Sequence, residues 1–228
     1  EKTFEMVRQA AAKADLSVAI VVDLQGPKIR LGKFKNGSHE IIKGAKFTIT
    51  TEVIEGDENI SSTTYLGLPG DCKVGDRILI DDGRVALEVT SVKAPRIETI
   101  VIEGGTVSNN KGLNLPGAAV SVPALSEKDE EDLKWAIGMG ADFIALSFVR
   151  DAADIKRVHQ IMDSAGVRIP VIAKIEKPQA VANLEEIVAA FDAIMVARGD
   201  LGVELPMEEV PLVQKRCITL ARENAKPV

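Results

Sequence analysis

Two short strings carry the side chains best suited to chemistry. Lys174 and Glu176 lie in the string AKIEKP, and Asp200 follows Gly199 in the string MVARGDLG. Each string follows an apolar, β-branched run and precedes a helical pattern, so we expect these side chains at the carboxyl ends of neighbouring parallel strands. Two carboxylates and an ammonium at one edge indicate a metal-assisted site for an anionic substrate.

Each of these residues also has a purely structural interpretation. Glu176 and Asp200 suit Mg²⁺, which one or two carboxylates often hold together with substrate and water, but acids before helices also act as caps. Lys174 has the same parity as Glu176, so both point the same way. The lysine would neutralise charge on a transferring phosphoryl group or an enolate, or it forms a salt bridge to Glu176. Gly199 lets a ligand approach the backbone, and a plain turn explains it equally well.

The composition argues against several classes of protein. The 228 residues are 46% hydrophobic, with 34 acidic and 28 basic side chains and a net charge of −6, which does not favour nucleic acid as a partner. Cys72 and Cys217 have no zinc-ligand spacing and fit a reducing cytoplasm. We find no signal peptide and no run of about 18 apolar residues, so we expect neither secretion nor a membrane span.

The predicted elements follow an α/β pattern that a β-rich module interrupts. A helix and a buried strand at 18–23 fill residues 1–25. Residues 26–121 contain short β-rich runs and turn signals, including a tight hairpin at Asp81-Asp82-Gly83, which predict a small all-β module. The strand–helix rhythm returns over residues 122–228. We therefore expect one catalytic domain, made of the first and last segments, with the β module inserted into it.

The last segment predicts a parallel sheet, because strands and helices alternate along it. The expected elements are helix 127–139, strand 143–146, helix 152–165, strand 171–175, helix 179–190, strand 193–197 and helix 207–224. Ser126 and Asp129 form a capping box at the first of these helices, and Trp135 is assigned to the core. A doubly wound sheet is possible, but functional residues after successive strands favour a partial (β/α)₈ TIM barrel. Four barrel-type strands, where a barrel needs eight, predict a piece of a longer protein.

Two basic residues lie at the crossings between the barrel and the β module. Arg30 ends the string DLQGPKIR after the first strand, and Lys111 lies in NNKGLNLPG at the return. Either residue is a candidate phosphate donor, and a plain loop is the alternative for each.

Together these strings resemble the pyruvate kinase family over essentially the whole chain. The matching strings are GPKIR, the DDG turn, NKGLNLPG, SEKD, ALSFVR, AKIE and MVARGDLGVELP. The resemblance implies phosphoryl transfer from phosphoenolpyruvate to ADP, giving pyruvate and ATP, the last step of glycolysis, in the cytoplasm. It also implies a mobile β-barrel lid inserted in the barrel, and a homotetrameric parent protein.

The resemblance also assigns roles to individual residues. Glu176 and Asp200 would hold Mg²⁺ or Mn²⁺, and Lys174 would stabilise the phosphoryl group in flight and the enolate. The backbone around Gly199 and Asp200 would receive the substrate carboxylate. Arg30 and Lys111 resemble nucleotide-phosphate contacts. Asp82 on the lid is a weaker candidate for the same role.

The chain departs from the family pattern near the monovalent-cation ligand, which Asp23 matches. Potassium-dependent members read DTKGPEIRT, whereas this chain has Leu24, Gln25, Lys28 and Leu31 at the differing positions. A lysine ammonium can supply the charge that K⁺ supplies elsewhere. We therefore hypothesise that Lys28 substitutes for K⁺ and that the parent enzyme does not require it.

Two other functions remain open at this point. A metal-dependent aldolase or lyase acting on pyruvate-like substrates would also use strand-end acids and a basic residue, although it needs no nucleotide contacts. A folded fragment without a competent barrel would be non-catalytic. Family segments that supply an arginine, further cation ligands and a threonine linked to enolate protonation are absent from the sequence, so we expect the 228-residue piece alone to be inactive.

Overall fold

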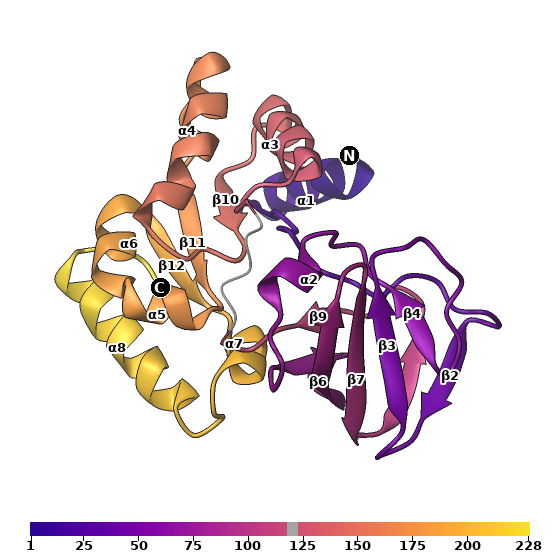
Figure 1. The fold of residues 1–228 in the computed structure, drawn as a ribbon. Helices are drawn as coiled ribbons and strands as arrows, with labels where there is room; N and C mark the ends of the chain where they lie inside the picture. Colours follow the sequence, from indigo (N-terminus) through magenta and orange to yellow (C-terminus); the bar gives the residue numbers. More distant parts are fainter. Residues whose placement is uncertain (118–122) are drawn as a thin grey trace. The chain divides into compact units, whose positions relative to one another are not determined.

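The structure, a computed structural model, describes residues 1–117 and 123–228 (Figure 1). Contacts divide the chain into two compact units. The first contains Glu1–Pro27, Pro123–Leu201 and Glu208–Val228, and the second contains Lys28–Val122 and Gly202–Met207. The three-segment domain division drawn from the sequence stays a prediction.

Strands and helices alternate in the first unit. Its strands are β1 (Val21–Asp23), β10 (Phe143–Leu146), β11 (Val171–Ile175) and β12 (Ala193–Val196). Its helical segments are α1 (Lys2–Lys13), α3 (Glu127–Met139), the 3₁₀ turn η1 (Ala152–Asp154), α4 (Ile155–Ser164), α5 (Pro178–Ala182), α6 (Leu184–Ala190), α7 (Arg198–Glu204) and α8 (Val210–Glu223). The last residues of α7 belong to the second unit. The strands pair in parallel in the order β1-β10-β11-β12, as the alternation predicted.

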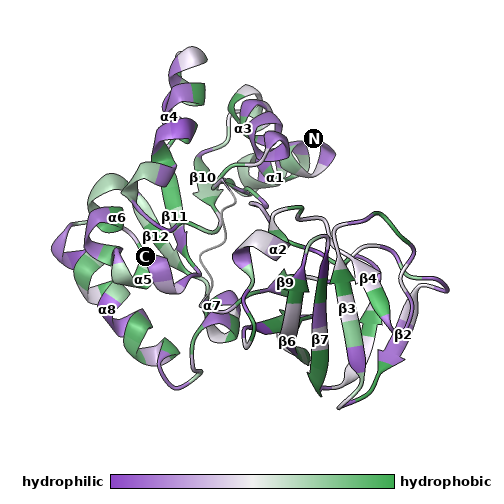
Figure 2. Cartoon of the chain, viewed as in Figure 1, coloured by the Kyte–Doolittle hydropathy of each residue, from purple (hydrophilic) through white to green (hydrophobic). Residues whose placement is uncertain are grey.

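Burial follows the predicted hydrophobic pattern in this unit. Strand β11 is buried along its length except at Lys174, as expected for a central strand of a parallel sheet. Helix α4 buries one stripe and exposes its polar side. Figure 2 shows the same contrast, with β11 mostly green and α8 carrying both colours. Strand β11 is therefore a rigid base for Lys174.

Several boundaries differ from the sequence prediction for local reasons. Strand β1 begins only at Val21, because the side chain of Asp142 accepts the Ile20 N–H at 2.6 Å in place of a ladder partner. The predicted helix 179–190 is divided into α5 and α6 at Asn183, whose side chain donates to the Arg150 carbonyl at 3.0 Å.

The prediction that Trp135 lies in the core is wrong, and the chain after β12 also differs from the predicted pattern. Trp135 is 41% exposed and meets Phe4 edge-on, with ring centroids 6.2 Å apart, so it lies at the rim rather than in the core. Residues Gly199 and Asp200, for which a plain turn was one of the interpretations, lie in the first turn of helix α7. The following helix begins later than predicted, at Val210, with a proline in its first turn.

The second unit consists mainly of β-strands. Its strands are β2 (Ser38–Ile41), β3 (Lys46–Thr50), β4 (Ile60–Ser62), β5 (Arg77–Ile80), β6 (Val85–Lys93), β7 (Arg96–Glu103), β8 (Gly105–Ser108) and β9 (Leu113–Asn114), with one short helix, α2 (Leu68–Asp71). Six strands form a sheet in the order β4-β3-β7-β6-β5-β9, and β2 pairs with β8. Large apolar side chains, among them Phe47, Ile78 and Leu87, fill its core.

The tight hairpin between β5 and β6 is confirmed. Asp81, Asp82 and Gly83 take φ values of 54°, 56° and 86°, so all three adopt the left-handed conformation that such turns require.

Among the residues that the structure describes, no helix has the length and apolar character needed to cross a membrane.

Candidate active site

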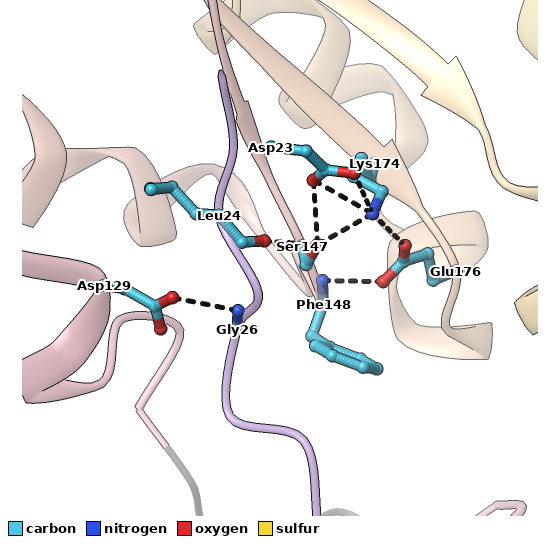
Figure 3. Close-up of polar contacts among 8 residues, drawn as sticks. All are labelled: Asp23, Leu24, Gly26, Asp129, Ser147, Phe148, Lys174 and Glu176. Atoms are coloured by element: carbon cyan, nitrogen blue, oxygen red, sulfur yellow. Dashed lines mark hydrogen bonds and ion pairs between the residues drawn. The ribbon is translucent and has the colours of Figure 1, made fainter. Parts of the chain in front are cut away.

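The Lys174 ammonium is the centre of a polar cluster at the end of β11. Its side chain is 13% exposed, and Nζ donates to Ser147 Oγ at 2.8 Å and to both carboxylate oxygens of Asp23 at 3.1 Å. Nζ also lies 3.1 Å from Oε1 of Glu176 (Figure 3). The salt bridge that the sequence left as an alternative role for Lys174 is therefore present, and the shared orientation predicted from parity is confirmed.

Electrostatics keep this lysine charged. Burial by itself lowers the pKa of Lys174, but the neighbouring carboxylates of Glu176 and Asp23 outweigh burial and raise it above its ordinary value. The group is therefore a fixed positive charge at neutral pH.

Glu176 is a buried carboxylate with each oxygen held by a different donor. Its side chain is only 2% exposed, Oε1 faces Lys174, and Oε2 accepts the backbone N–H of Phe148 at 2.9 Å. Burial raises the pKa of Glu176, the Lys174 ammonium and the Phe148 N–H lower it in part, and the negative charge of Asp200 raises it further. The two acids predicted from the sequence are thus close enough to interact.

The donor set at this place suits a hard divalent cation. Mg²⁺ and Mn²⁺ accept one or two carboxylates and complete their coordination with substrate oxygens and water. The influence of Asp200 on the pKa of Glu176 is the repulsion that a cation between two carboxylates would relieve. No group of three or more His, Cys, Asp or Glu side chains with metal-binding geometry occurs among residues 1–117 and 123–228.

Gly199 borders open space, because a Cβ built there meets nothing within 4 Å.

Sequence reasoning missed two functional candidates in this cluster, Ser147 and Phe148. Ser147 is almost fully buried, and its Oγ donates to the Leu24 carbonyl at 2.8 Å while accepting from Lys174. Phe148 contributes its N–H from a left-handed conformation, with φ at 57°. The sequence signal available was the string ALSFVR directly after a predicted strand, but a backbone donor has no residue signature.

Arg30 and Lys111 come together within the second unit. Arg30 pairs with Gly112 in an isolated bridge, and its guanidinium donates to the Asn110 carbonyl at 2.9 Å. Lys111 Nζ forms a 2.8 Å ion pair with Asp81, and this hydrogen bond is the main cause of a lowered pKa at Asp81. Asp82, at the tip of the same hairpin, is exposed.

The two residues of the potassium hypothesis fall in different units. Asp23 belongs to the first unit, where it pairs with Lys174. Lys28 belongs to the second, where its side chain lies over Gly112: a Cβ built on that glycine would be 3.1 Å from Lys28 Cε. The role of Lys28 as a substitute for K⁺ stays a prediction.

Both cysteines are buried and free. Burial, with Asp76 and Asp71 nearby, raises the pKa of Cys72 to about 12, and burial raises the pKa of Cys217 to about 11. Neither thiol is therefore ionised at neutral pH, which argues against a nucleophilic role.

The sequence of this chain matches one protein family along its whole length. A family model described as the barrel domain of pyruvate kinase matches residues 1–228. Similar curated proteins include the pyruvate kinases of Corynebacterium efficiens, at 60% identity over all of this chain and 48% of the relative, and Mycobacterium tuberculosis strain H37Rv, at 57% over 99% of this chain and 48% of the relative. The pyruvate kinase of Geobacillus stearothermophilus is 44% identical over 97% of this chain and 38% of the relative.

The match confirms the predicted fold class, a partial α/β barrel, and the parallel sheet of the first unit is consistent with it. The chain spans about half the length of the first relatives, or less. With a family match over every residue and close identity to its curated members, the chain belongs to the pyruvate kinase family.

Proposed function

We propose that the longer protein containing this chain transfers the phosphoryl group of phosphoenolpyruvate to ADP, giving pyruvate and ATP. The observation that carries the proposal is the Lys174 ammonium, which the fold holds at the end of β11 between Asp23, Ser147 and Glu176. A preorganised positive charge in a partly buried site stabilises charge that develops during transfer. The family relationship supports the same reaction.

Each residue of the site has a separate proposed role in this reaction. Lys174 would neutralise the phosphoryl oxygens in transit and then the enolate oxygen of pyruvate. The backbone around Gly199 and Asp200 would receive the substrate carboxylate. Asp23 and Ser147 hold the Lys174 ammonium in one position, so little reorganisation accompanies the reaction.

Glu176 and Asp200 are the proposed ligands of Mg²⁺ or Mn²⁺. Their fit rests on a buried carboxylate whose pKa is raised by burial and further by the second acid. When bound, the metal would supply Lewis-acid polarisation of substrate oxygens. Phe148 fixes one oxygen of Glu176, which orients the carboxylate in advance.

The second unit is proposed to act as the lid that binds nucleotide. Arg30 and Lys111 are the proposed phosphate contacts, with Asp82 as a weaker candidate. Exclusion of water by a closed lid favours ADP as the acceptor. We further propose that the parent is a cytoplasmic homotetramer of glycolysis and that Lys28 makes K⁺ unnecessary.

The competing functions are less well supported. A metal-dependent aldolase or lyase does not explain the family match or the paired segments that carry Arg30 and Lys111. The non-catalytic alternative applies to the 228-residue chain by itself, which we propose to be inactive because it spans about half of its relatives.

A coupled assay tests the function directly. The longer protein is expected to form pyruvate from phosphoenolpyruvate only when ADP and Mg²⁺ are both present. Rates measured with and without K⁺ at constant ionic strength should be equal. Pyruvate formation independent of ADP would contradict the kinase assignment, and strong activation by K⁺ would contradict the role of Lys28 alone. The 228-residue chain, assayed in the same way, tests the proposal that it is inactive by itself.

A further inference from the structure

The bond between Phe148 and Glu176 depends on an unusual backbone conformation. Phe148 donates its N–H to Oε2 of Glu176 at 2.9 Å from a left-handed backbone, with φ at 57° (Figure 3). Side chains with a Cβ rarely adopt this conformation, so neighbouring groups must hold it in place.

Gly26 is the neighbour that packs against this turn. A Cβ built on Gly26 would lie 2.6 Å from Cδ2 of Phe148 and 3.0 Å from Cβ of Ser147. Gly26 also has a φ of 71°. The loop after β1 and the turn after β10 therefore fit together only because Gly26 has no side chain. The Ser147 hydroxyl also joins these two segments, because it donates a hydrogen bond to the Leu24 carbonyl.

Asp129 in turn holds Gly26. Its carboxylate is fully buried in the first turn of α3, and Oδ1 accepts the Gly26 N–H at 3.1 Å. Oδ2 accepts the N–H of Ser126 at 2.9 Å and its hydroxyl at 2.5 Å, which completes the capping box. The sequence explains the bonds to Ser126, but the bond to Gly26 has no part in capping the helix.

We propose that Asp129 is a positioning residue for the Lys174–Glu176 pair, acting through Gly26 and the Phe148 turn. The chain of contacts runs from Asp129 Oδ1 to the Gly26 N–H, from Gly26, whose position leaves no room for a Cβ, to the Phe148 ring, and from the Phe148 N–H to Glu176. This inference rests on the proposed function only in treating Glu176 as a metal ligand. The contacts themselves can be tested without that assumption.

Two substitutions separate positioning from helix capping. Asp129→Asn keeps the size of the side chain but leaves one carbonyl oxygen, which cannot serve Gly26 and Ser126 together. Ser126→Ala is the matched control, because it weakens the same helix cap and leaves the bond between Asp129 and Gly26 intact. Gly26→Ala is the second test, since it retains Asp129 and pushes directly on Phe148.

The first readout is hydrogen exchange at the Phe148 amide, measured by NMR in the 228-residue chain. Asp129→Asn and Gly26→Ala should each abolish its protection, whereas Ser126→Ala should retain it even if the melting temperature falls equally. The second readout is Mn²⁺ affinity of the longer protein by electron paramagnetic resonance. Asp129→Asn should weaken it about tenfold, the lower end for residues that orient a metal ligand, with Ser126→Ala unchanged.

Each outcome decides something definite. Retained Phe148 protection in Asp129→Asn, or an equal loss in Ser126→Ala, would overturn the positioning role. If Asp129→Asn does not fold, Gly26→Ala tests the later part of the path with the same two readouts: retained Phe148 protection there would overturn the proposal, because every contact from Asp129 to Glu176 runs through Gly26. Absence of Mn²⁺ binding in the unaltered protein would instead count against the proposed function, and the exchange data would still decide whether Asp129 positions Glu176.

Discussion

The two units hold their candidate cations in opposite ways. In the first, Lys174 is 13% exposed and surrounded by two carboxylates and a hydroxyl. In the second, the Lys111 side chain is 35% exposed and forms an ion pair with one carboxylate, Asp81. A charge enclosed by several partners is fixed by the fold, whereas a partly exposed pair is weaker and exchanges more readily with solvent or a ligand. The difference suits one cation to chemistry and the other to reversible binding.

The sheets of the two units differ as well. The second unit has a filled core beneath mainly antiparallel strands. The parallel sheet of the first unit lines an apolar groove of about 580 Å³, whose walls include Val21, Phe143 and Ile194. The first unit therefore combines the most constrained side chains of the site with a sheet face that remains open to solvent.

The largest effect is expected from removing the enclosed cation, Lys174. Lys174→Met in the longer protein should lower kcat about 10²–10³-fold, as loss of a preorganised electrostatic contact does. The coupled assay measures it, and Lys128→Met, at an exposed lysine on α3 that pairs with Asp132, is the control. A loss no larger than that of the control would remove the distinction between the two cations.

A smaller effect is expected from the more exposed cation, Lys111. Lys111→Met should raise the KM for ADP about tenfold and leave kcat nearly unchanged. A change of about tenfold is what the loss of one hydrogen bond to a charged group is expected to cost in binding. Initial rates at varied ADP provide the measurement, with the exposed Lys33 changed to Met as the control. If kcat falls and KM does not change, Lys111 acts in the chemical step and the comparison is wrong.

The contrast between the sheets predicts different protection from hydrogen exchange. In the 228-residue chain, central strands β6 and β7 should exchange at least about tenfold more slowly than β1 and β12, a difference of about 1.4 kcal/mol in local opening. Mass spectrometry of the exchanged peptides measures this. Equal protection would show that the open sheet face carries no cost in local stability.

The smallest effect concerns acid stability of the first unit. The Ile20 N–H, and then the Arg8 guanidinium, hold the pKa of Asp142 below its ordinary value despite some burial. Stability from this carboxylate is therefore present above an ordinary pKa of about 3.9 and is lost as pH falls through the lowered pKa.

Asp142→Asn should remove this pH dependence and lower the unfolding free energy at pH 7 by less than about 1 kcal/mol, because the pair is partly exposed. Urea unfolding at pH 7 and at successively lower pH measures both changes. Arg8→Met tests the second cause, and it should reduce the pH dependence without abolishing it. A variant as acid-sensitive as the original protein would exclude Asp142 as the responsible group.

Much of the fold was readable from the sequence, because its signals are local. The capping box of Ser126 and Asp129, the hairpin at Asp82 and the parity of Lys174 with Glu176 follow from spacing alone. The break at Asn183 was not readable, because it depends on a carbonyl 33 residues away.

The missed part of the site has a different cause. Ser147 and Phe148 act on Lys174 and Glu176 through bonds that form only once β10 and β11 lie side by side. Trp135 was misplaced because an aromatic residue on a helix gives no sign of whether a neighbour covers it.

The Phe148 contact has a consequence for how tolerant this position is to mutation. The donor is the main chain, so every amino acid except proline supplies it. Asparagine or glycine at position 148 should fit the left-handed backbone with less strain than phenylalanine, while retaining the donor. A scan of substitutions would then separate two losses: proline removes the donor, whereas glycine and other small residues keep the donor but lose the ring that packs against Gly26. The donor that helps to orient the proposed metal ligand would thus leave little trace in the identity of its own residue, and a preference for phenylalanine would report the packing of its ring.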